Sequence, residues 1–143
     1  MTKSTNWLAI IVAAVAGMGI GFLFYGTLFL DVWAAGNNLI IDEANNTMSR
    51  NGVDIEMSAT PMIVNAIAMV LYALIMDWLV AKTNHMSWAK GATLGGIVGL
   101  AFFFSHYTQA MFAARPNMLG AVNGGYHLVL FIVIGAIVGG WRK

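Results

Sequence analysis

The chain has 143 residues, of which 59% are hydrophobic and 9% are charged, and its mean hydropathy is +0.76. This composition lies outside the range of ordinary globular domains and is typical of multi-pass membrane proteins, so the lipid bilayer is the first partner that we expect. The net charge of +1 excludes a basic surface for nucleic acid, and the lack of cysteine excludes disulfides, thiolate metal sites and a cysteine nucleophile.

Four apolar stretches are long enough to cross a bilayer, which takes about 20 apolar residues in a helix. They cover residues 7–30, 61–81, 88–111 and 118–141. The first follows Lys3, as the core of a secretory signal would, but its apolar run is too long for such a core, so we interpret it as a retained helix. The pattern predicts an all-α membrane protein, a bundle of four transmembrane helices in a single domain over residues 1–143.

A polar loop is predicted over residues 31–60, between the first two spans. Its asparagines, for example in Asn51-Gly52, favour turns around two short apolar segments. Five of the six acidic residues fall in this loop, whereas Asp77 alone lies near the opposite end of a span, close to Lys82. We expect Asp77 to end at the membrane interface and the loop to form an extracytoplasmic cap.

The basic residues predict the orientation of the bundle. Arg50 and Arg115 lie on the side of the polar loop, and the other five lie on the side of both termini, namely Lys3, Lys82, Lys90, Arg142 and Lys143. Cytoplasmic loops carry the excess of lysine and arginine in membrane proteins. We therefore expect both termini in the cytoplasm.

Tryptophans mark a common depth in the membrane, because one lies at the predicted cytoplasmic end of each span: Trp7, Trp78, Trp88 and Trp141. At 1.5 Å per residue, several polar residues of the spans lie roughly 20 to 27 Å outward from their own tryptophan. Helical angles turn them toward the interior of the bundle. We expect them to meet there together with Gln109, which lies beside the His106 face of its helix, and we name the six residues the polar tier: Tyr25, Asn65, His106, Gln109, Asn123 and His127.

Glycines repeat at four-residue spacing along three of the spans. Such a spacing puts them on one helix face and lets a second helix backbone approach closely. We name these positions the glycine faces and expect them to be buried, either within one monomer or between subunits: Gly17 and Gly21 in the first span, Gly91, Gly95 and Gly99 in the third, and Gly135 and Gly139 in the fourth.

For His106 and His127 the favoured interpretation is hydrogen bonding between helices, as intramembrane imidazoles commonly provide. A water-lined pocket or permeation path comes second, because polar groups at membrane depth often mark ion or proton routes. A paired metal or haem site has no support from the spacing, and no carboxylate or thiolate is expected at that depth. We assign no catalytic residue, no metal ligand and no cofactor.

Three segments carry a resemblance to a known family: "NWLAIIVAAVAGMGIGFLFYGTLF", "SWAKGATLGGIVGL" and "GGYHLVLFIVIGAIVGGW". They resemble the small bacterial membrane proteins grouped as domain of unknown function 1761. In that family the first helix closes with a Trp-Tyr-Ser-Pro-like stretch, where this chain has Phe24-Tyr25-Gly26-Thr27. The resemblance implies a four-helix membrane protein and brings no agreed activity. We expect the protein in the bacterial inner membrane.

Two functions from different classes follow from these patterns. The favoured one is a non-enzymatic accessory or assembly subunit that packs through its glycine faces against itself or another membrane protein. The alternative is a small permeation or ligand-binding protein that uses the polar tier.

Overall fold

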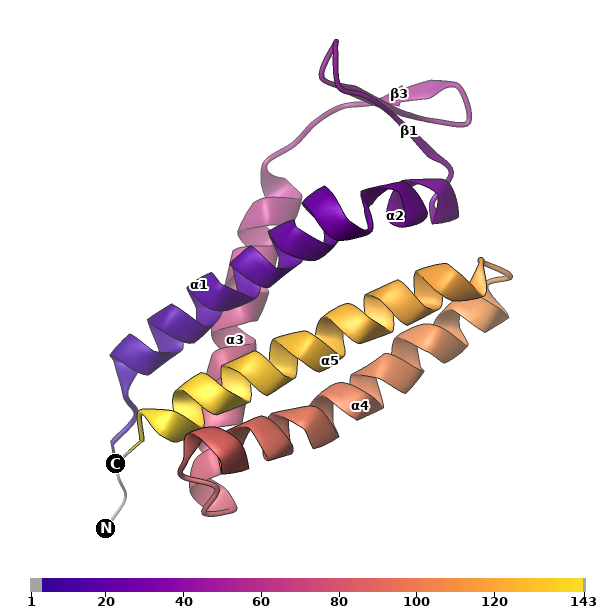
Figure 1. Ribbon diagram of the computed structural model, residues 1–143. Helices are drawn as coiled ribbons and strands as arrows, with labels where there is room; N and C mark the ends of the chain where they lie inside the picture. Colours follow the sequence, from indigo (N-terminus) through magenta and orange to yellow (C-terminus); the bar gives the residue numbers. More distant parts are fainter. Residues whose placement is uncertain (1–3, 143) are drawn as a thin grey trace.

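The computed structural model describes residues 4–142, and over these residues the chain forms four long helices with a short helix and a small sheet at one end (Figure 1). The long helices are α1 (Trp7–Leu23), α3 (Thr60–Lys82), α4 (Trp88–Phe112) and α5 (Asn117–Gly140). All four are long and apolar enough to cross a membrane, α1 together with the π-turn that follows it. The predicted all-α class with four membrane-length helices is therefore confirmed.

Local sequence explains where the helices begin. The Asn6 side chain accepts a hydrogen bond from the Ala9 amide at the start of α1, and Ser87 does the same for Lys90 at the start of α4. Pro61 occupies the first turn of α3, where its missing N–H has no helical partner to lose.

The sequence pattern predicts one continuous helix over residues 7–30, but the first span does not continue as a plain helix to residue 30. It changes into a π-helical turn, η1 (Phe24–Leu28), breaks at Phe29, and resumes as the short helix α2 (Leu30–Gly36). A π-turn widens the backbone and redirects the chain. As a result α2 lies over the N-terminal start of α5. There Gly36 packs on Leu119, and the Arg115 guanidinium donates to the Gly36 carbonyl at 2.9 Å.

The polar loop contains a three-stranded antiparallel sheet, an element that the sequence pattern did not predict. Its strands β1 (Leu39–Asp42), β2 (Thr47–Arg50) and β3 (Val53–Ile55) lie side by side in chain order. Asn51 and Gly52 both have positive φ, 53° and 80°, as a two-residue hairpin turn between β2 and β3 requires.

The hairpin between β1 and β2 is closed by Asp42. Its carboxylate accepts hydrogen bonds from the side-chain amide of Asn45 and from the backbone amides of Asn45 and Ala44. These bonds, above all that of the Asn45 side chain, hold the pKa of Asp42 below its usual value.

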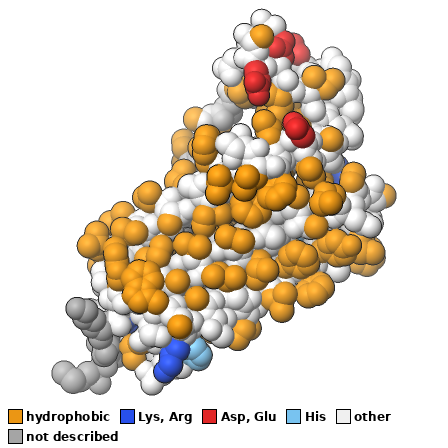
Figure 2. All heavy atoms as spheres, in the orientation of Figure 1, with side chains coloured by type: hydrophobic (Ala, Val, Ile, Leu, Met, Phe, Trp, Pro, Cys, Tyr) orange, Lys and Arg blue, Asp and Glu red, His pale blue; other side chains and the backbone are white. Residues whose placement is uncertain are grey.

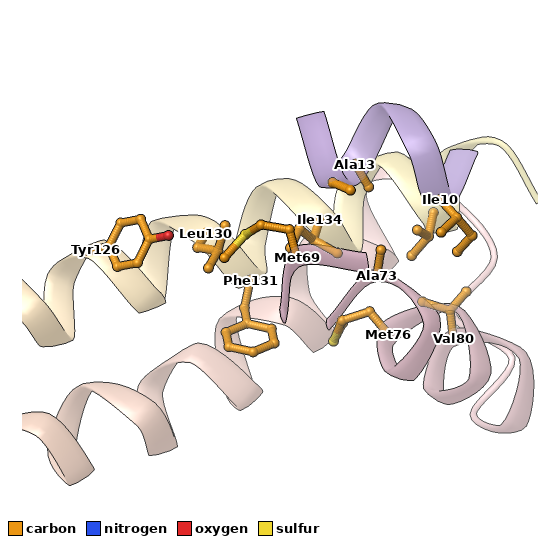
Figure 3. Packing of buried hydrophobic residues seen from close by; sticks show 12 residues of the cluster. Ile10, Ala13, Met69, Ala73, Met76, Val80, Tyr126, Leu130, Phe131 and Ile134 are labelled. Atoms are coloured by element: carbon orange, nitrogen blue, oxygen red, sulfur yellow. The ribbon is translucent and has the colours of Figure 1, made fainter. Parts of the chain in front are cut away.

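The core lies where α1, α3 and α5 meet, and α5 is the most buried of the long helices (Figure 3). Small residues of α1 allow close packing there, and large apolar side chains of α3 and α5 fill the space. Those labelled in Figure 3 are Ile10 and Ala13 of α1, Met69, Ala73, Met76 and Val80 of α3, and Tyr126, Leu130, Phe131 and Ile134 of α5. Helix α4 packs along α5 and barely touches α3.

Hydrophobic side chains cover the flank of the molecule, as expected of helices that face lipid (Figure 2). Acidic side chains gather on the part that contains the sheet, whereas no acidic side chain of residues 4–142 is seen at the opposite end, where a lysine or arginine side chain lies beside a histidine. Figure 1 places the beginning of α1 and the end of α5 together at that opposite end. The two ends of the bundle therefore differ in charge.

Candidate functional site

The glycine face of α4 lies directly on α5. A Cβ atom added at Gly95 would overlap the carbonyl oxygen of Phe131, and one at Gly91 would overlap that of Gly135. At Gly99 the added carbon would lie 2.8 Å from the Leu128 Cα atom. Two backbones this close exclude any side chain, so these glycines let α4 and α5 form one tightly packed helical hairpin.

The remaining glycine-face positions are also in contact within the chain. Gly139 lies against the start of α4, where an added Cβ would be 2.7 Å from the Ser87 carbonyl oxygen. On α1, Gly17 packs against the Met69 sulfur, and Gly21 lies against the hydroxyl of Tyr126. The glycine faces named from the sequence are thus occupied by neighbouring helices of the same chain.

The close approach of α4 and α5 brings two histidines of the polar tier together. The rings of His106 and His127 stack at a centroid distance of 4.2 Å with an interplanar angle of 25°. We name these two residues the histidine pair. One turn before His106, the ring of Phe102 also lies parallel to that of His127, at 5.7 Å and 10°.

The hydrogen bonds of the histidine pair are unequal. His127 Nδ1 lies 2.9 Å from the carbonyl oxygen of Asn123, which only accepts, so Nδ1 carries the hydrogen and Nε2 is left as an acceptor when the ring is neutral. His106 is half-buried, and neither of its ring nitrogens has a hydrogen-bond partner among residues 4–142. The pair therefore presents imidazole nitrogens that the described protein does not satisfy.

A second polar contact anchors the site to the first span. The Tyr25 hydroxyl, in the π-turn η1, donates to the Asn123 side-chain oxygen at 3.0 Å. The Tyr25 ring also packs edge-on against Tyr126 at 5.1 Å and Trp33 at 6.1 Å. The redirected end of the first span thus holds Asn123, whose backbone in turn fixes His127.

Two members of the polar tier stay apart from this group. Gln109 is exposed on α4, and Asn65 is half-buried on α3; neither forms a side-chain hydrogen bond with the other tier residues within residues 4–142. The reason lies in the helix arrangement, because α3 and α4 diverge from their short connection toward the sheet end (Figure 1). Helix α5 covers the His106 side of α4, and Gln109 lies about 60° further round.

A buried ion pair at the other end of the bundle was missed by the sequence reasoning. Asp77 is paired with Arg142: its carboxylate lies 2.7 Å from the Arg142 guanidinium, which also donates to the Asp77 carbonyl at 2.6 Å. Both residues are buried, at 3% and 9% exposure. A charged side chain inside an apolar span requires a partner of opposite charge. Applied to Asp77, this rule could have predicted that a basic residue pairs with it.

Beside this ion pair the start of α1 is tied to the same segment, since the Asn6 side chain donates to the Trp141 carbonyl at 3.2 Å. Three helices are therefore connected at this end by polar contacts to residues 141 and 142. Within residues 4–142, no group of three or more His, Asp or Glu side chains is arranged to hold a metal ion.

Comparison with known proteins gives a family and no individual relative. No curated protein and no solved structure matches the chain. A family model described as "Protein of unknown function (DUF1761)" matches residues 8–139, a range that includes almost all of the four long helices, the sheet, the histidine pair and Asp77. The chain therefore belongs to the DUF1761 family of proteins of unknown function.

Proposed function

We propose that this protein is a non-enzymatic, multi-pass membrane protein that passes protons across the bilayer, one at a time, by way of the histidine pair. The observation that carries the proposal is the His106 imidazole, which is half-buried at membrane depth without a hydrogen-bond partner among the described residues. Polar groups are costly in lipid unless they are paired or reach water. An imidazole kept in this position is suited to exchange with a partner from outside the chain.

The geometry of the pair supports a single occupant. Two imidazolium rings with centroids 4.2 Å apart would repel each other, so the pair accommodates one positive charge. The aromatic ring of Phe102 and the anchored Asn123 hold His127 in place, which leaves His106 as the more adjustable ring. The Nε2 atom of the fixed His127 ring can accept a proton beside the more adjustable His106 ring, and such an arrangement can take up and release a proton.

The assembly role loses the support that the glycine faces gave it. Those glycines are in contact with other helices of the same chain, so they are not free to pack against another subunit. Binding to a second copy of the chain or to another membrane protein stays a prediction, and the proposed role of the histidine pair does not depend on it.

We further propose that the protein lies in the bacterial inner membrane with both termini in the cytoplasm. Lys82 and Lys90 are exposed and flank the connection of α3 to α4, which lies at the end opposite the sheet (Figure 1). Arg142 contributes less to this argument than the sequence suggested, since it is buried with Asp77. Lys3 and Lys143 lie outside the described residues.

The test uses two measurements on the same variants, His106→Gln and His127→Gln, with Ser105→Ala as the matched control at an exposed neighbouring position. Purified protein in liposomes that enclose a pH-sensitive dye reports proton flux, and unfolding in nanodiscs reports stability. We expect either histidine variant to lower the flux several-fold with little change in stability. A loss of stability of about 1 kcal/mol with unchanged flux would assign the histidines to interhelical bonding instead.

A further inference from the structure

The small sheet has one apolar face and one polar face. Strand register puts Leu39, Arg50 and Val53 in one row and Ile41, Met48 and Ile55 in the next, and side chains in such rows point to the same side. The opposite face carries Ile40, Asp42, Thr47, Ser49 and Asp54. Arg50 is thus the only charged residue on the apolar face, and the acidic residues of the strands are on the other.

The apolar face is turned toward the membrane-spanning part of the molecule. Leu39 and Ile41 line a hollow of about 310 Å³ together with Leu30, Asp31 and Ala34 of α2 and with Glu43 of the β1–β2 turn, so β1 lies over that helix. Strand β3 lies two strand spacings further out, roughly 10 Å. There α2 no longer covers the face, and Val53 is 68% exposed.

The chain itself limits how far β3 lies from the bilayer. Strand β3 ends at Ile55 and the membrane-length helix α3 begins at Thr60, so a fully extended link spans at most roughly 17 Å. The first turns of α3 are exposed on all sides and include Met62 and Ile63, as expected of a helix end surrounded by lipid. The uncovered apolar strand is therefore held close to the surface of the leaflet that α3 crosses.

We propose that Arg50, Val53 and Ile55 form a lipid-docking surface, with the two apolar side chains resting among the headgroups and the guanidinium on lipid phosphates. Only residues 56–59 separate Ile55 from the lipid-facing start of α3, and the acidic face of the sheet, with Asp54, is opposite to the face that carries Val53 and Ile55. Guanidinium groups suit phosphate because they donate two parallel hydrogen bonds. This surface does not depend on the function of the histidine pair.

Single-cysteine variants test the proposal cleanly, because the chain has no cysteine of its own. Val53→Cys and the matched control Asp54→Cys, on opposite faces of β3, each carry a nitroxide label in nanodiscs of phosphatidylcholine and phosphatidylglycerol. We expect the label at position 53 to collide mainly with oxygen, which concentrates in lipid, and the label at position 54 mainly with a water-soluble nickel chelate. Arg50→Gln should reduce the shielding at position 53, and more strongly when phosphatidylglycerol is present, because its net negative headgroup adds to the attraction of the phosphate.

Three results would overturn the proposal. Equal access of the nickel chelate to both positions would place the sheet in water. Shielding at position 53 from both reagents, with spin broadening that disappears on dilution with unlabelled protein, would show that a second copy covers this face. Unchanged shielding at position 53 after Arg50→Gln, with and without the anionic lipid, would rule out the phosphate contact.

Discussion

Gly95→Ala should weaken the packing of α4 on α5, because the added methyl group has no room between the two backbones. The added methyl carbon would overlap the carbonyl oxygen of Phe131 and lie 2.7 Å from its carbonyl carbon and 3.1 Å from the Ile132 Cα atom. All three are backbone atoms, so no rotamer change can relieve the overlap. An ordinary contact between an alkyl carbon and a carbonyl oxygen is about 3.3 Å or longer.

The two helices must therefore separate by about 1 Å near Gly95, and a gap of that size forfeits up to about half of the dispersion energy of the contacts along it. Overpacked interiors cost about 1 to 3 kcal/mol, and we expect the upper end because the obstacle is backbone. Gly96→Ala is the matched control: its Cβ would meet only the Ile132 side chain, at 3.6 Å. Both changes gain the same helix propensity, about 1 kcal/mol, which cancels in the comparison.

Denaturant titration in bicelles, followed through the five tryptophans, measures the difference in the free energy of unfolding. We expect Gly95→Ala to be about 3 kcal/mol less stable than Gly96→Ala. If the two variants unfold at the same denaturant concentration, the close backbone contact between α4 and α5 is refuted, and with it the packing that stacks the histidine pair.

Three further predictions concern other parts of the bundle. Asp77→Asn should lower the free energy of unfolding by about 3 to 5 kcal/mol, because the buried Arg142 loses its counter-charge. Replacing both residues, by Asp77→Leu and Arg142→Leu, should recover most of that loss, and a loss under about 1 kcal/mol for Asp77→Asn alone would contradict the prediction. Tyr25→Phe, which removes one interhelical hydrogen bond, should cost only about 0.6 to 1 kcal/mol in the same titration, and a larger loss would assign the tyrosine a wider role. Cysteines introduced at Thr83 and Ala44, both exposed, should be labelled from the cytoplasmic and the opposite side of the membrane respectively, and labelling of both from one side would refute the topology.

The long helices were predictable from sequence because their apolar runs are far longer than any alternative element requires. The sheet was not, because its strands have only three or four residues, too few for alternation to be distinguished from a polar loop. The bend at Phe29 was likewise hidden, since a π-turn inside an apolar run leaves the composition unchanged.

The candidate site was predictable in part. Depth and helical angle suffice to place His106 near His127, because both lie on the helices that the glycines bring into contact. Asn65 also matched in depth, but depth cannot reveal that α3 and α4 diverge. Gln109 was included as a neighbour of the His106 face, and its helical angle, about 60° away, leaves it outside the contact with α5. The partner of Asp77 could not be chosen by nearness in sequence, because Arg142 comes 65 residues later and meets it only after the bundle forms.

The central position of α5 has a consequence for the order of membrane insertion. Helices α1, α3 and α4 precede it in the chain and leave the ribosome first, yet each of them packs on α5. Until α5 is inserted, the glycine face of α4 has no backbone to contact, and the Asp77 carboxylate lies in its span without Arg142. Early intermediates of this protein therefore expose the glycine face of α4 and the unpaired carboxylate of Asp77 to lipid. By these two features, chaperones and proteases of the membrane can distinguish an incomplete bundle from a complete one.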